Sequence, residues 1–145
     1  MKSVADIFGI ETITKDAYRY ALTHSSFTKE KELPYNECYE RLEFLGDAVL
    51  KLTISDVLFK MFPDFQEGQL SKIRSIVVSD NTLADIAKKN GLQDLIIMSK
   101  HEEKQGCRKL NSICACAFEA TLGAYYLDGK YKELETYIAK TFRSE

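Results

Sequence analysis

The sequence has no tryptophan, only two prolines and seven glycines among its 145 residues, and no long hydrophobic run. So few turn-forming residues argue against a many-stranded β protein, and we expect an all-α fold. No uncharged segment of 18 residues is present to span a membrane, and Asp6 interrupts the first apolar stretch, which argues against a secretory signal. We therefore expect a cytoplasmic protein that does not associate with membranes.

Neither positive nor negative charge is in large excess: the sequence has 20 Lys and Arg and 22 Asp and Glu, which gives a net charge of −2. The overall charge thus gives no sign of nucleic-acid binding, which would need a local basic face. The four cysteines are expected to be reduced thiols. With 45% hydrophobic residues, a chain of this length is expected to form one compact domain over residues 1–145.

Apolar periodicity and capping residues predict a series of helices separated by short loops. Asp64 and Glu67 have the form of a capping box, and the polar segments 28–33 and 100–109 are expected to be loops. The predicted helices run from Thr14 to about Leu22, from Asn36 to Met61, from Asp64 to Val77, from Ser79 to Gly91, from Asn111 to Leu127 and from Lys132 to Phe142.

Acidic residues follow one face of the longest predicted helix. Glu40, Glu43 and Asp47 in the segment YERLEFLGDAVL (39–50) are three and four residues apart, a spacing that places them on the same side. The opposite side is expected to face the core through the apolar residues Leu42, Leu45, Val49 and Leu52. Such acids are often only the solvated face of an amphipathic helix, but we expect no local cation to neutralise these, and Phe44 beside them suggests a partner subunit.

Two glycines and one carboxylate connect this helix with the later one. Gly46 is unfavourable within a helix and suggests a close contact there. Glu119 is the only carboxylate in the apolar segment 111–127, and Gly123 lies on the same face one turn later. If the helices cross at the two glycines, Glu43, Asp47 and Glu119 converge into a set of oxygen ligands suited to Mg²⁺ or Mn²⁺.

A zinc site is the alternative metal centre, since His101, Cys107, Cys114 and Cys116 provide four nitrogen or sulfur ligands in one region. Their spacing does not favour it: there is no CxxC pair, and Cys114 and Cys116 point to different faces of a helix.

The segment ERLEFLGDAVL (40–50) closely resembles the signature of ribonuclease III endonuclease domains. YALTHSSF (20–27), FQEGQLSKIRS (65–75) and AFEATLGAYYLD (117–128) resemble further motifs of that family in the expected order. The resemblance covers nearly the whole chain. It implies a helical, dimer-forming endonuclease domain without the double-stranded-RNA-binding domain that usually follows.

The resemblance also implies the reaction: hydrolysis of phosphodiesters in double-stranded RNA with Mg²⁺, for which Mn²⁺ substitutes. The expected products carry 5′-phosphates and short 3′ overhangs, and the expected roles are rRNA and mRNA processing. By motif position, Glu43, Asp47 and Glu119 are the catalytic metal-binding acids, Glu40 and Glu67 are accessory acids, and Phe44 enters the partner subunit of a homodimer. For Glu67 a capping role is equally compatible with the sequence.

One position departs from the family pattern: Cys116 stands where the family has an Asp ligand. A thiol is a poor ligand for Mg²⁺, so Cys116 is a doubtful ligand. Cleavage with three carboxylates, a shift of preference toward Mn²⁺, and a catalytically weakened or inactive dimeric RNA-binding or assembly module all remain open. Candidate RNA contacts are the basic residues Lys72, Arg74, Lys100, Lys104, Arg108 and Lys109.

Overall fold

The computed structural model describes residues 2–143, and within them the fold is helical, with a single isolated parallel bridge between Thr23 and Ile97. The α-helices are α1 (Val4–Phe8), α2 (Lys15–Ala21), α3 (Ser25–Glu30), α4 (Glu40–Met61), α5 (Glu67–Val77), α6 (Asp80–Lys89), α7 (Lys100–Lys104), α8 (Asn111–Leu127) and α9 (Tyr131–Arg143). Short 3₁₀ turns span Tyr35–Glu37, Leu92–Leu95 and Cys107–Lys109. The all-α prediction is confirmed.

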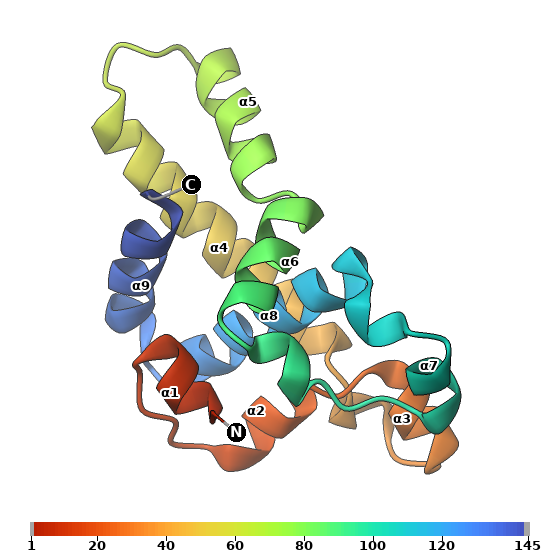
Figure 1. Ribbon diagram of the computed structural model, residues 1–145. Coiled ribbons are helices and arrows are strands. Elements are labelled where there is room, and N and C mark those ends of the chain that lie inside the picture. The colour runs from red at the N-terminus through yellow and green to blue at the C-terminus, as the bar shows by residue number, and fades with distance from the viewer. Residues whose placement is uncertain (1, 144–145) are drawn as a thin grey trace.

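Helix α8 occupies the centre of the molecule, and α4 and α6 pack most extensively against it (Figure 1). Its side chains are buried on all sides from Ala117 to Tyr125, as expected for a helix that is apolar around its whole circumference. The C-terminal half of α4 and helix α5 extend away from this centre, whereas α3 and α7 lie together at the opposite end. The backbone N–H of Lys100 donates to Glu30 there, at 3.0 Å.

The C-terminal end of α8 is tied to the segment that precedes α2. Asp128 accepts hydrogen bonds from the backbone N–H groups of Ile13 and Thr14, at 2.9 and 3.1 Å, and from the hydroxyl of Tyr18. Burial raises the pKa of this carboxyl, but the hydrogen bonds outweigh burial and lower it to about 2. Asp128 is therefore a structural residue.

Most predicted helices are confirmed, including the end of α4 at Met61 before Pro63 and the capping of α6 by Ser79. The prediction of loops at 28–33 and 100–109 is partly wrong, because Ser25–Glu30 forms α3 and Lys100–Lys104 forms α7. None of the helices in residues 2–143 is both long and apolar enough to cross a membrane. The cytoplasmic location stays a prediction.

Two predicted helix starts are wrong. Asn36 does not cap α4: it lies in a 3₁₀ turn, and the helix begins at Glu40. Asp64 does not cap α5, whose capping box is formed by Gln66 and Gln69. Helix α4 begins after Tyr39 without a side-chain cap, and the cap of α5 lies two residues later than predicted, so the spacing of polar residues alone does not specify either start.

The buried face of α4 also differs from the predicted one. Val49 is buried as expected and Leu42 packs at the edge of the core, but Leu45 is only partly buried and Leu52 is 59% exposed. The buried side instead includes Gly46 and Leu50, because α8 packs there. The acids Glu43 and Asp47 consequently lie next to the helix interface and not opposite it.

The predicted crossing of α4 and α8 at two glycines is confirmed. A Cβ atom placed on Gly46 would lie 1.6 Å from the carbonyl oxygen of Glu119, and one on Gly123 would lie 2.3 Å from the carbonyl oxygen of Leu42. The two backbones are therefore in direct contact, and no other residue type fits at either position without moving a helix.

We expect Gly46→Ala to destabilise the protein by about 3 kcal/mol or more, because the added methyl group forces α4 and α8 apart. Gly68→Ala is the matched control: it lies in α5 with no atom within 4 Å of the added Cβ, and we expect a change of about 1 kcal/mol or less, in the stabilising direction. Urea denaturation measures both. Equal effects at the two positions would contradict the crossing.

Candidate active site

The glycine crossing brings acids from two distant parts of the sequence together. Glu43 and Asp47 come from α4, and Glu119 comes from α8, 72 residues after Asp47. Glu119 is only 7% exposed, and its carboxyl shares a hydrogen bond with that of Asp47. Because the carbonyl of Glu119 lies against Gly46, the approach of the helix backbones places these side chains side by side.

The protonation of Glu119 reflects this crowding. Burial is the largest cause, followed by the hydrogen bond to Asp47 and by the negative charges of Asp47 and Glu43, and together they raise its pKa from 4.5 to about 9. At neutral pH the metal-free site therefore keeps a proton. A bound cation would relieve the repulsion between a buried carboxylate and its neighbouring carboxylates.

Cys116, one turn before Glu119, contacts the acids as the sequence predicts. Its thiol donates a hydrogen bond to Oε2 of Glu43 at 2.9 Å. Burial raises the pKa of the thiol, and the hydrogen bond to Glu43 raises it further, so the sulfur stays protonated. In this state Cys116 is a hydrogen-bond donor to a metal-binding candidate and offers no thiolate.

The expectation of acids without a local cation is wrong for Asp47. Lys51 follows it by one helical turn, and the Lys51 Nζ atom lies 3.2 Å from Oδ2 of Asp47. An i,i+4 pair of this kind is visible in the sequence itself. The ion pair is partly exposed, with 51% of the Lys51 side chain and 43% of the Asp47 side chain accessible.

A fourth acid, Asp80, was not predicted for the site. It is the first residue of α6, and its charge acts on both Glu119 and Cys116. Its only sequence signal is its place after the predicted cap Ser79, and its proximity to the site follows from the packing of α6 on α8.

The two accessory acids interact with other residues of the chain. Glu40 opens α4 near Tyr35, and its interaction with the Tyr35 hydroxyl raises the pKa of that group. Glu67 opens α5 and is exposed, and its carboxylate accepts a hydrogen bond from Ser71 at 3.1 Å. The structure gives Glu67 no contact with the acids of the glycine crossing.

The donor set suits a hard divalent cation, because it consists of carboxylates around one nearly buried member. As the side chains stand, no three His, Cys, Asp or Glu residues in the described part of the chain are arranged to hold a metal ion. The acids form two pairs instead, Glu43 with Cys116 and Asp47 with Glu119. The oxygen atoms of these residues are thus chemically suited to such an ion. To bind it, Glu43 would have to break its hydrogen bond with the Cys116 thiol.

The alternative zinc ligands have separate partners. Cys107 donates to Glu102 at 3.0 Å, Cys114 is directed at the carbonyl of Arg108 at 3.3 Å, and Cys116 is bound to Glu43. Their thiols therefore do not share a site.

The basic residues proposed for RNA contact fall into two groups. Arg108 is held by two hydrogen bonds to Glu103, at 2.7 and 2.9 Å, and Arg74 donates to Ser55 at 2.8 Å. By contrast Lys72, Lys100, Lys104 and Lys109 are exposed. Nothing in the structure tests their role.

Phe44 is 83% exposed, although it lies one residue from the acid Glu43. It borders an open cavity of about 830 Å³ whose lining is formed by α2, the segment 35–38, the first turns of α4 and Leu127. Apolar side chains at this cavity include Ala17, Tyr20 and Leu45. An exposed phenylalanine beside an apolar hollow is typical of a protein interface.

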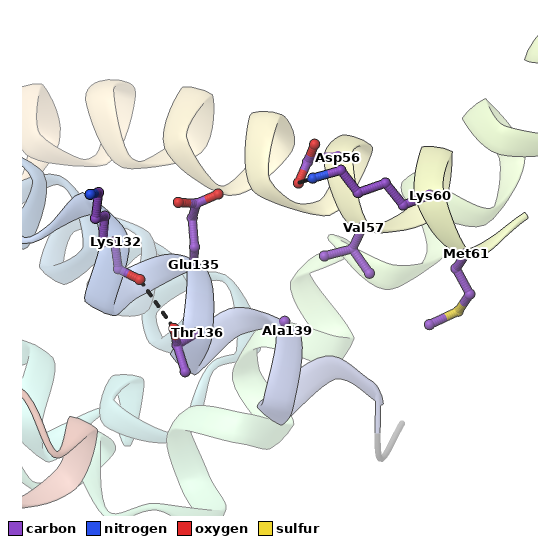
Figure 2. Close-up of a pocket in the computed structure, with 8 residues that line it drawn as sticks. All are labelled: Asp56, Val57, Lys60, Met61, Lys132, Glu135, Thr136 and Ala139. Carbon is purple, nitrogen blue, oxygen red and sulfur yellow. Dashed lines mark hydrogen bonds and ion pairs between the residues drawn. The ribbon is translucent and has the colours of Figure 1, made fainter.

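A second groove, of about 600 Å³, lies between the C-terminal part of α4 and α9, away from the acids (Figure 2). Its charged residues include an ion pair, with Lys60 Nζ 3.2 Å from Asp56 Oδ2. None of the predicted catalytic residues lines it.

Fold and site together define a helical domain in which two glycine-packed helices present carboxylates beside an exposed aromatic residue. The family described as ribonuclease-III-like matches residues 15–145, so the chain belongs to the ribonuclease III family. Its fold is that of the family's nuclease domain.

Individual relatives support the same family. The chain is 45% identical over 126 residues to ribonuclease 3 of Oleidesulfovibrio alaskensis, an alignment that covers 86% of this chain and 54% of that protein. The chain spans about half the length of the curated relatives it matches. A crystal structure of the nuclease domain of ribonuclease III from Campylobacter jejuni has 35% identity and a TM-score of 0.87, covering 99% of this chain and 96% of that one. A second structure of that domain has 37% identity and a TM-score of 0.85, covering 95% and 92%.

We expect Glu119→Gln to stabilise the metal-free protein at pH 7 to 8 by about 1–3 kcal/mol. Because the pKa of Glu119 is raised, folding takes up a proton between pH 4.5 and about 9, so wild-type stability falls as pH rises through this window. The glutamine variant should lack this contribution. Denaturation with a chelator present, at several pH values, measures it.

Glu133→Gln is the matched control, since Glu133 is an exposed residue of α9. It should retain the wild-type dependence on pH. An unchanged dependence in Glu119→Gln would show that this carboxyl is ionised in the folded protein.

Proposed function

We propose that this chain is a divalent-metal-dependent endoribonuclease that hydrolyses double-stranded RNA. The observation that carries the proposal is the buried Glu119, in contact with Asp47 where α4 and α8 cross at Gly46 and Gly123. Membership of the ribonuclease III family supports the same reaction.

Glu43, Asp47 and Glu119 would hold the ion, and Mg²⁺ is the cation that best suits their oxygens, with Mn²⁺ able to substitute. When bound, such an ion lowers the pKa of a water nucleophile and neutralises charge that develops on the phosphodiester. The two helices contribute by fixing the carboxylates before substrate arrives. Glu43 would exchange its hydrogen bond with the Cys116 thiol for the ion, and Asp80 adds negative charge nearby.

Double-stranded RNA is the proposed substrate, cut into products with 5′-phosphates and short 3′ overhangs during rRNA or mRNA processing. Relatives of this chain carry the name ribonuclease 3, which supports this assignment. Lys72, Lys104 and Lys109 are the candidate phosphate contacts because their side chains are exposed, whereas Arg74 and Arg108 already have partners. With a net charge of −2, this chain should bind RNA weakly and lose affinity steeply as salt rises.

A homodimer is the proposed assembly. In a two-fold dimer each copy presents the same patch, so Phe44 of one subunit can enter the cavity beside Phe44 of the other. A Campylobacter jejuni nuclease domain is described as having structural flexibility in a region involved in dimer formation, which supports an assembly of this kind.

The second candidate function is a catalytically weakened dimeric RNA-binding or assembly module. The hydrogen bond from Cys116 to Glu43 favours it, because it keeps one acid turned toward a protonated thiol and away from the pair formed by Asp47 and Glu119.

Cleavage of a long RNA duplex with Mg²⁺ or Mn²⁺ tests the proposal. We expect the wild-type chain to cleave and Glu119→Gln to lower the rate about 100-fold or more, because a ligand is lost. Cys116→Asp should raise the rate, since it supplies a further oxygen ligand and frees Glu43. Glu133→Gln on α9 is the control and should cleave at the wild-type rate.

An inactive wild type that is activated by Cys116→Asp would support the weakened module. Absence of cleavage by every variant with both metals would contradict the endonuclease proposal.

Phe44→Ala should weaken dimerisation about 30-fold or more, because the removed ring is the proposed central anchor of the interface. Leu110→Ala changes an exposed residue directly before α8 that does not line the cavity beside Phe44, and it should leave dimerisation unchanged. Sedimentation velocity over a range of protein concentrations measures both. A monomeric wild type would overturn the proposed assembly.

A further inference from the structure

Lys51 forms an ion pair with one of the candidate metal ligands. Its Nζ atom lies 3.2 Å from Oδ2 of Asp47, and Asp47 in turn shares a hydrogen bond with the buried Glu119. The ammonium group is therefore linked through one carboxylate to the most buried acid of the site.

Two other lysines form similar pairs one helical turn after an aspartate. Lys60 is paired with Asp56 at 3.2 Å, and Lys89 with Asp85 at 2.9 Å. Asp56 lies nine residues after Asp47 on the same helix, or about 13 Å along its axis, in the groove of Figure 2. The pair of Lys51 and Asp47 differs because its carboxylate belongs to the acid cluster.

A divalent cation held by Glu43, Asp47 and Glu119 would use the same carboxylate that Lys51 now contacts. Two positive groups within a few ångströms of each other repel, and the repulsion is doubled by the charge of a divalent ion. The ammonium group must then move away from Asp47 or weaken the binding of the ion. Because half of the Lys51 side chain is exposed, it has room to move into solvent.

We propose that Lys51 is a resident counter-ion of this site: it neutralises Asp47 while no metal is bound and is displaced from Asp47 by the divalent cation. Its charge thereby sets the affinity for the ion. Lys51 is a positioning residue and takes no part in the reaction, and the inference rests on the proposed function, since it requires that the acids bind a divalent cation.

Binding of Mn²⁺ to the metal-free protein, followed by electron paramagnetic resonance and by calorimetry, tests this without any measurement of cleavage. Lys51→Gln removes the charge and should lower the Kd for Mn²⁺ about threefold to tenfold, an effect limited by solvent screening. Lys51→Arg keeps the charge and should retain the wild-type Kd. Lys60→Gln removes an equivalent ion pair from the same helix and should also leave the Kd unchanged.

Thermal denaturation separates this role from a purely structural one. Loss of a helix ion pair alone would lower the melting temperature of Lys51→Gln equally with and without Mn²⁺. The proposed role instead predicts a larger rise in melting temperature on addition of Mn²⁺ than in the wild type.

The possible failures are distinguishable. If the wild-type protein binds no Mn²⁺, the proposed function fails and the counter-ion role fails with it. If the wild type binds Mn²⁺ but Lys51→Gln binds it equally or more weakly, only the role of Lys51 is overturned. An equal gain in Lys60→Gln would show a general effect of surface charge and would also overturn it. Should Lys51→Gln not fold, Lys51→Met applies the same test.

Discussion

The direct contact of α4 and α8 is the constraint on which the candidate site depends. Side chains at Gly46 and Gly123 would overlap the backbone of the facing helix, so the contact requires glycine at both positions. The short separation brings carboxylates 72 residues apart in sequence, Asp47 and Glu119, into hydrogen-bond contact. A glycine within a helix costs stability, and here that cost is offset by the packing that the close approach permits.

The same contact creates an electrostatic problem, because it buries one carboxyl beside others. Three features relieve it: Cys116 donates a hydrogen bond to Glu43, Lys51 pairs with Asp47, and the raised pKa of Glu119 favours its protonated form. A divalent cation would replace all three with one positive ion. In the proposed function, this balance lets a helical domain of net charge −2 bind a metal and, through it, a polyanionic substrate.

Much of the fold was predictable because long helices have a strong periodic signal. The C-terminal end of α4, both ends of α8 and the cap of α6 follow from local chemistry. The crossing of α4 and α8 follows from two glycines that are unfavourable within helices. The caps of α4 and α5 were missed, and so were the short helices α1, α3 and α7, because helices of five or six residues are too short to show a helical period. Leu52 was assigned to the core because hydrophobicity alone does not distinguish the face that α8 covers from one left exposed.

By itself, the sequence determined the helical class and the family, and it singled out Glu43, Asp47 and Glu119 as candidate metal ligands, because periodicity and residue chemistry are local properties of the chain. Only the tertiary structure decided which partners those acids meet: Cys116 against Glu43, Asp47 against Glu119, and the charge of Asp80 from α6. Protonation depends on burial and on neighbours from other helices, and these exist only once α4, α6 and α8 are packed together.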